Sequence, residues 1–171
     1  MTAARSRTLG AIHPCSVATA LDGIAREHRH LPRCQGGLVA FEARNRAGWP
    51  VGWCLIGRPV SRVLQARGWV EVVRCATTGR CWGAASALYR AADAWARENR
   101  GGLVTYTLEH ETGASLLAAG WVPIGWTQTR PSQWDRASRR RRRRADVIAA
   151  PKRRWAPPWA AELWACREDT P

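Results

Sequence analysis

Long apolar runs are missing from this chain, although apolar residues make up 46% of its 171 residues. A membrane-spanning helix needs about 20 consecutive apolar residues, and no segment approaches that length. The first ten residues contain two arginines with no apolar core after them, so we expect no signal peptide. The sequence therefore predicts a cytoplasmic, globular protein that does not bind membranes, of a length that suits one domain.

Metal-binding cysteine spacing is also missing. The six cysteines lie at positions 15, 34, 54, 75, 81 and 166, with no Cys-x-x-Cys pair. Thiols stay reduced in the cytoplasm, and this spacing does not fit a zinc knuckle, so we expect no metal. His28 and His30 lie near Cys34, which leaves open whether they bind a metal, line an acceptor site or only end a helix, where cations are favourable.

Lysine is almost absent, because 26 of the 27 basic residues are arginine. The codon usage of a GC-rich genome can produce this bias, so arginine in place of lysine has no functional meaning by itself. The distribution of charge is more informative. The formal net charge is +14, and eleven basic residues lie between positions 130 and 154. This predicts a polyanionic partner such as DNA, bound by Arg130, Trp134, Arg139, Arg140, Arg141, Arg142, Arg143, Arg144, Arg153 and Arg154.

Alternating apolar residues and turn residues predict strands and helices along most of the chain. The expected order gives an α/β protein with a mixed central sheet flanked by helices. We expect one domain over residues 1–130 and a basic, Arg- and Trp-rich C-terminal extension over 131–171. Within the extension, Pro131, the arginine run and Pro151 predict a loop or arm. The expected strands cover 9–13, 38–44, 51–58, 69–76, 103–108 and a segment from Trp121, and the helices follow Ser16, Gly83, Gly113 and Pro157.

The segment from Glu71 to Tyr89 contains the strongest functional pattern. A β-branched run leads through a loop of small residues into an amphipathic helix. The first N–H groups of a helix lack partners and attract anions. Gly83 and Ala85 leave room for a phosphate, and Arg80 adds a cation beside it. The alternative is an ordinary helix start.

The spacing Arg80-x-x-Gly83-x-Ala85 resembles the pyrophosphate-binding loop of the GNAT acyltransferases. The segment 113–121, a short helix with glycine at its end, resembles the later GNAT motif and follows in the right order. The resemblance covers roughly residues 9–130 and implies a GNAT fold and acetyl-coenzyme A or another acyl-coenzyme A as cofactor. It implies cofactor contacts from the loop and from the backbone of the central strand: Gly79, Arg80, Gly83, Ala84 and Ala85 with the diphosphate, and Arg74, Cys75 and Ala76 with the pantetheine arm.

Further segments resemble a phage and prophage branch of the same superfamily, which is associated with Mom-type DNA-modification proteins. This resemblance implies an enzyme that modifies DNA bases. The segments are 57–62, Glu71-Val72-x-Arg74, 105–108, 111–116 and 151–155.

Acyl transfer to an amine needs a base for the amine proton and a proton donor for the leaving thiolate. Glu71 is the candidate base, and its alternative role is an ion pair with Arg74. The tyrosine that serves as acid in the GNAT motif is replaced by Leu116. Tyr106, Ser115 or water could donate instead, although Tyr106 could be a core aromatic and Ser115 a helix cap.

Three functions remain open. The first is an acyl-coenzyme-A-dependent transferase acting on DNA or on a modified base. The second is a transferase for a protein or small-molecule amine, and the third is a nucleic-acid-binding protein that lacks transferase chemistry. Candidate acceptor-site residues are His28, His30, Arg58 and Glu111.

Overall fold

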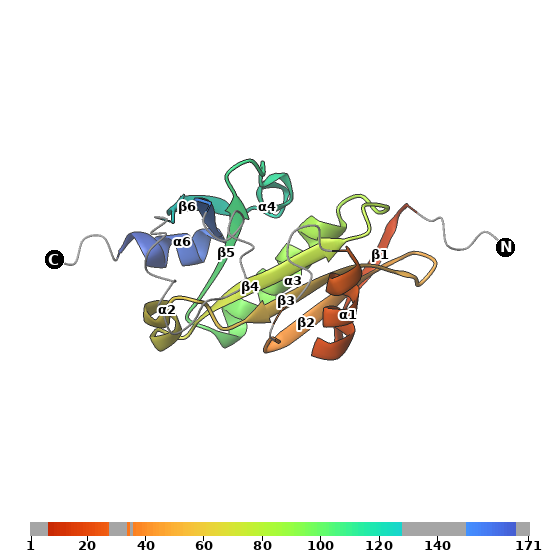
Figure 1. Cartoon of the computed structure of the whole chain (residues 1–171), viewed down its shortest axis with the longest axis horizontal. Coiled ribbons are helices and arrows are strands. Elements are labelled where there is room, and N and C mark those ends of the chain that lie inside the picture. Colours follow the sequence, from red (N-terminus) through yellow and green to blue (C-terminus); the bar gives the residue numbers. More distant parts are fainter. Residues whose placement is uncertain (1–6, 28–33, 35, 128–149, 167–171) are drawn as a thin grey trace, which may run out of the picture.

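The computed structural model describes residues 7–27, 34, 36–127 and 150–166. They form one seven-stranded sheet in the order β1-β2-β3-β4-β5-β7-β6 (Figure 1). No helix within these ranges is long and apolar enough to cross a membrane. The strands are β1 (Leu9–Cys15), β2 (Val39–Asn45), β3 (Pro50–Gly57), β4 (Trp69–Thr77), β5 (Gly102–Leu108), β6 (Val122–Trp126) and β7 (Lys152–Ala156), and the helices are α1 (Val17–Glu27), α2 (Arg62–Ala66), α3 (Ala84–Asn99), α4 (Ala114–Ala118) and α6 (Pro158–Ala165).

The sheet is mixed, as the sequence predicted. β4 and β5 are parallel, because α3 crosses between them, and the other neighbouring strands are antiparallel. The predicted turn between β2 and β3 is also present. The Asn45 side-chain oxygen accepts hydrogen bonds from the N–H groups of Ala47 and Trp49 at 3.0 and 2.9 Å, and Gly48 takes the left-handed conformation that the turn needs.

Helices α1 and α3 cover opposite faces of the sheet, with α1 in front of it and α3 behind it in Figure 1. β3 lies between them and is buried from Val51 to Gly57, which explains its nearly continuous apolar sequence. The α3 face holds the larger core cluster, which includes Ile56, Val72, Leu88, Ala92 and Leu103. The α1 face holds Ala20, Ile24, Trp53 and Leu55.

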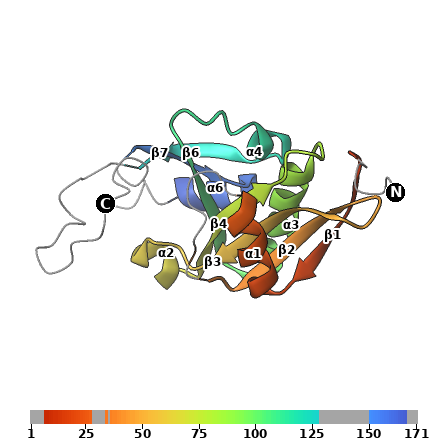
Figure 2. The same cartoon turned by 45° about the vertical axis from the view of Figure 1, so that its right-hand side comes forward.

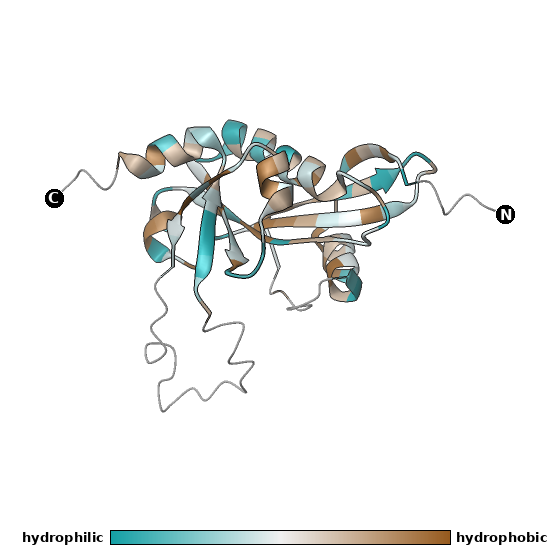
Figure 3. Cartoon of the chain, turned by 90° about the horizontal axis from the view of Figure 1, so that it is seen from above, coloured by the Kyte–Doolittle hydropathy of each residue, from teal (hydrophilic) through white to brown (hydrophobic). Residues whose placement is uncertain are grey.

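Strand β7 was not predicted from the sequence, nor was α2. β7, labelled at the upper left of Figure 2, enters the sheet between β5 and β6. It brings part of the expected C-terminal extension into the sheet. Three of its five residues are cationic, so it is a teal strand in Figure 3. Trp155 holds it in place: this side chain is 1% exposed, and its indole N–H donates to the Thr107 hydroxyl at 2.9 Å.

Two glycines that flank α4 offer a matched test of this packing. Gly113 and Gly120 both have left-handed φ angles, +68° and +85°. A Cβ at Gly113 would lie 2.3 Å from the Trp155 ring, whereas one at Gly120 would meet nothing within 4 Å. Gly113→Ala and Gly120→Ala should both lose about 1–2 kcal/mol of unfolding free energy through backbone strain. Gly113→Ala should lose about 1–3 kcal/mol more, because its methyl group overpacks against Trp155. Urea unfolding of both variants measures the difference, and equal losses would contradict this packing of Trp155.

Candidate active site

The central strands β4 and β5 pair over only part of their length. Their parallel ladder ends at Glu71 and Val104, although both strands continue beyond it. From Thr105 onward β5 pairs with β7 instead. At the point of divergence the Thr105 hydroxyl donates to the Val72 carbonyl oxygen at 2.9 Å. The second half of β4 therefore has β3, but not β5, as a ladder neighbour.

A bulge in β4 puts Glu71 and Arg74 on one face of the sheet. The register with β3 shifts between Leu55 and Ile56. Arg74 then lies opposite Leu55, and Glu71 lies opposite Gly57, two residues further along β3. Because residues two apart on a strand share a face, the carboxylate and the guanidinium belong to the same side of the sheet.

Glu71 is a buried carboxylate, with a residue exposure of 8%. One of its oxygens accepts a hydrogen bond from the Val60 N–H at 3.2 Å. Burial raises the pKa of Glu71 above its ordinary value of 4.5, while the Val60 hydrogen bond and the charges of Arg74 and Lys152 act in the opposite direction. A carboxylate with a raised pKa is suited to accept a proton near neutral pH.

Strand β7 adds cations to the face that carries Glu71. In the β5–β7 ladder Tyr106 lies opposite Arg154 and Leu108 lies opposite Lys152. Val104, which pairs with Glu71, shares its face with Tyr106 and Leu108. Glu71, Tyr106, Lys152 and Arg154 therefore point to one side of the sheet.

The electrostatic effects agree with this placement. Burial and the charge of Glu71 raise the pKa of Tyr106 to about 12, although Arg154 opposes the shift. The phenol therefore stays protonated at neutral pH and can donate a hydrogen bond or a proton. Burial lowers the pKa of Lys152; the charge of Glu71 raises it, and that of Arg74 lowers it further.

Lys152 is a member of this cluster that sequence reasoning missed. It was counted only as one of many cations, because β7 was not expected and nothing else placed it beside Glu71. A weak signal was available: residues 152–156 form a strand-length segment between Pro151 and Pro157 that ends in apolar Trp155 and Ala156.

The loop before α3 has the backbone that an anion site needs. Gly79 and Gly83 have φ angles of +70° and +76°, which favour glycine. Gly83 is the N-cap of α3 and makes no side-chain cap hydrogen bond. A Cβ at Gly79 would meet nothing within 4 Å, and one at Gly83 would meet only the Ser86 hydroxyl at 3.9 Å. Arg80 is exposed beside them, so these residues fit a bound diphosphate.

Known structures share this architecture. The IAA acetyltransferase of Bacillus cereus aligns with 86% of this chain and 97% of its own, with a TM-score of 0.56 and 13% identity. A GNAT family acetyltransferase of Elizabethkingia anophelis, solved with acetyl-coenzyme A bound, aligns over 86% and 96% (TM-score 0.54, 14% identity). The ribosomal-protein-S18-alanine N-acetyltransferase of Escherichia coli aligns over 86% and 92% (TM-score 0.53, 10% identity). The chain has the GNAT fold. No protein-family model and no curated protein matches its sequence.

Leu116, where the resemblance to the later GNAT motif leads us to expect a proton donor, is a core residue. Leu116 is 1% exposed and packs in the α3-side core cluster. Ser115 is exposed on α4. Of the two hydroxyl groups that the sequence offered as candidates, Tyr106 lies on the face of Glu71, whereas Ser115 lies on the surface of α4.

The two described arginines of the predicted nucleic-acid-binding set take different positions. The Arg153 guanidinium lies over the rings of Trp126 and Trp155, at 5.7 and 5.1 Å from their centroids. Arg154 lies over Trp164 of α6 at 4.9 Å. Each stacking interaction fixes a planar cation on an aromatic face. Arg154 then lies beside Tyr106, whereas Arg153 points to the opposite side of β7.

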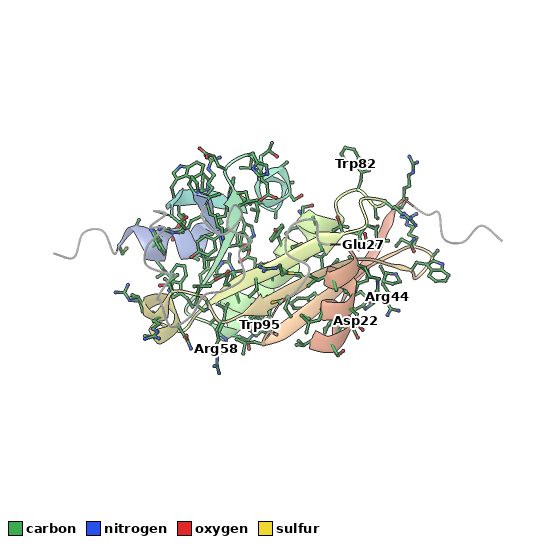
Figure 4. The ribbon with its side chains drawn as sticks, in the orientation of Figure 1. Asp22, Glu27, Arg44, Arg58, Trp82 and Trp95 are labelled. Atoms are coloured by element: carbon green, nitrogen blue, oxygen red, sulfur yellow. The ribbon has the colours of Figure 1, made fainter. Side chains whose placement is uncertain are left out.

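The remaining candidates are dispersed. The Glu111 carboxylate accepts a hydrogen bond from the Leu108 N–H at 2.8 Å. Arg58 is exposed. In Figure 4 it points outward at the bottom of the view, whereas Trp82 protrudes at the top. Cys75 lies opposite Cys54, and Ala76 opposite Trp53, in the β3–β4 ladder; Ala84 and Ala85 open α3. Within the described ranges no three His, Cys, Asp or Glu residues come together as a metal site. His28, His30, Arg130, Trp134, Arg139, Arg140, Arg141, Arg142, Arg143 and Arg144 lie outside those ranges.

The raised pKa of Glu71 gives a pH-dependent stability prediction. Below 4.5 the carboxyl is protonated in both the folded and the unfolded protein. As the pH rises through the folded-state pKa, the folded protein must bury a charge, so this contribution to stability is lost. Glu71→Gln has no such charge and should become more stable relative to wild type as the pH rises from about 4 to 8.

Urea unfolding at a series of pH values measures this difference. Glu98→Gln on the exposed surface of α3 is the control and should follow wild type. A difference between wild type and Glu71→Gln that does not change with pH would contradict the burial of an ionisable carboxyl at this position.

Proposed function

We propose that this chain is an acyl-coenzyme-A-dependent N-acyltransferase that modifies an amine on DNA bases. The observation that carries the proposal is the divergence of β4 from β5 beside Glu71, in a protein of GNAT fold whose α3 begins at a glycine cap open to an anion. Acyl-coenzyme A would supply the activated acyl group. A cytoplasmic location would place the protein with both acyl-coenzyme A and DNA.

Different residues of the chain would bind the cofactor and transfer protons. Gly79, Arg80 and Gly83 would hold the diphosphate, with Ala84 and Ala85 at the start of α3. The pantetheine arm would bind to the backbone of Arg74, Cys75 and Ala76. These residues lie on the part of β4 that does not pair with β5. Glu71 would accept the proton of the attacking amine, either directly or through water. The protonated Tyr106 hydroxyl would donate to the leaving thiolate.

The DNA acceptor is supported by charge. The net charge of +14 is concentrated in residues 130–154, and two cations of this segment, Lys152 and Arg154, lie on the face of Glu71. A base amine inside a duplex is stacked, so the enzyme would act on a flipped base or on a single strand. A base amine is also a weak nucleophile, because its lone pair is delocalised into the ring. A modified base that carries an alkyl amine is therefore the easier acceptor.

A protein amine is the second candidate. The E. coli structural relative is named as an N-acetyltransferase of a ribosomal protein. A nucleic-acid-binding protein without transferase chemistry is the third, because Leu116 stands at the usual donor position and is part of the core.

The cofactor is tested by calorimetry. Acetyl-coenzyme A should bind the wild-type protein, and Gly83→Asp should abolish binding, because an acidic side chain at an anion site adds both bulk and repulsion. Gly48→Asp is the matched control, since Gly48 also has a left-handed φ and open space but lies in the β2–β3 turn. A wild-type protein that does not bind acetyl-coenzyme A would contradict the transferase proposal.

The acceptor is tested by mass spectrometry of nucleosides. DNA from cells that express the wild-type protein should contain an acylated nucleoside, and DNA from cells that express Glu71→Gln should not, because the base for the amine proton is gone. If both samples contain only the nucleosides of the host while acetyl-coenzyme A still binds, the DNA acceptor is wrong. A protein or small-molecule amine then becomes the leading candidate.

A further inference from the structure

Lys152 is the single lysine of the chain. It is half-buried on β7, opposite Leu108 of β5. Its side chain therefore shares a face with Tyr106 and Glu71, on the part of the sheet where β5 pairs with β7 and no longer with β4. Among the described residues it forms no ion pair within 4.0 Å. The one primary-amine side chain of this protein thus lies on the same face as its candidate catalytic base, and the charges of the two groups interact.

We propose that Lys152 is itself an acyl acceptor, so that the protein acylates its own β7 at this position. The inference depends on the proposed acyl-coenzyme-A-dependent activity, but it does not depend on DNA as the external acceptor.

The surroundings of Lys152 favour a reactive amine. Only the neutral form of an amine is a nucleophile, and a half-buried lysine beside other cations is neutral more often than an exposed one. Tyr106 of β5 and Arg154 of its own strand share the face of Lys152, and the charges of Glu71 and Arg74 of β4 act on it. Burial and Arg74 lower the pKa of Lys152, and Glu71 opposes them.

The proposed step is balanced without any additional reagent. The neutral Lys152 Nζ attacks the thioester carbonyl carbon of acyl-coenzyme A, an N–C bond forms and the C–S bond breaks. The sulfur leaves with the bonding electron pair and takes a proton from the Tyr106 hydroxyl or from water. The proton lost by the amine passes to the Glu71 carboxylate. The products are an amide on Lys152 and the free coenzyme A thiol.

The modification would change the site. An amide has no charge, so Glu71 would lose one of the cations that face it, and the acyl group would fill part of the face where an external amine must approach. An alkyl amide is not readily cleaved, so the product would be a lasting modification that slows transfer to external acceptors.

The presence of a single lysine makes the test direct. Purified full-length protein is incubated with acetyl-coenzyme A and analysed by intact mass and by peptide mass spectrometry. One acetyl group should appear on Lys152, and modification already present after expression would count in the same way. Lys152→Arg should remain unmodified on side chains. Glu71→Gln should slow the reaction about 100-fold or more, which is the range for loss of a general base.

A second variant separates enzymatic from spontaneous acetylation. The double variant Lys152→Arg with Arg46→Lys has the same number of lysines, but its lysine lies in the exposed turn between β2 and β3, and β2 is far along the sheet from β7. It should react much more slowly than wild type. An independent readout is the NMR titration of reductively methylated Lys152, whose pKa should be below that of a free lysine and should fall further in Glu71→Gln.

Two results would overturn the inference. The first is equal acetylation rates for Lys152 and for the lysine at position 46. The second is an unmodified Lys152 in a protein that binds acetyl-coenzyme A by calorimetry, which would leave the proposed transferase activity intact. A protein that does not bind acetyl-coenzyme A would overturn both proposals together.

Discussion

The change of partner along β5 is the constraint on which the rest of the site depends. The first residues of β5 pair with β4, and the later residues pair with β7. A strand must satisfy its backbone hydrogen-bonding groups with some neighbour, so β5 can leave β4 only because β7 is available to replace it. Trp155 makes that replacement stable by filling the core beside Gly113 and Thr107. The packing of one tryptophan thereby supports the separation of β4 from β5 beside Glu71.

The same strand sets the electrostatics of the candidate site. Strand alternation sends Trp155 and Arg153 to one side of β7 and sends Lys152 and Arg154 to the other. The β4 bulge directs Arg74 to the side of Glu71. A buried carboxylate that interacts with two cations, Arg74 and Lys152, is less costly than one alone, so Glu71 can remain buried and still exchange a proton. Tyr106 stays protonated at neutral pH. The face therefore carries one group suited to accept a proton, Glu71, and one suited to donate a proton, Tyr106.

Much of the fold followed from the sequence because it depends on local patterns. Asn45 to Gly48 specified a turn, Leu88 and its α3 neighbours specified a helix with one apolar face, and Gly83 marked where that helix starts. The structure confirms the mixed sheet flanked by helices. β7 could not be predicted in the same way, because its three consecutive cations mask the alternation of a strand, and its burial depends on residues almost fifty positions away in β5.

The sequence by itself determined the order of most elements, the glycine-capped loop before α3 and the candidacy of Glu71 and Tyr106, since each of these is encoded within a few neighbouring residues. Only the tertiary structure decided which of these groups meet. The strand registers brought Glu71, Arg74, Tyr106, Lys152 and Arg154 to one face, left Ser115 on the surface of α4 and placed Leu116 in the core. Long-range strand pairing is fixed by the packing of the whole sheet, and no local pattern in the chain contains that information.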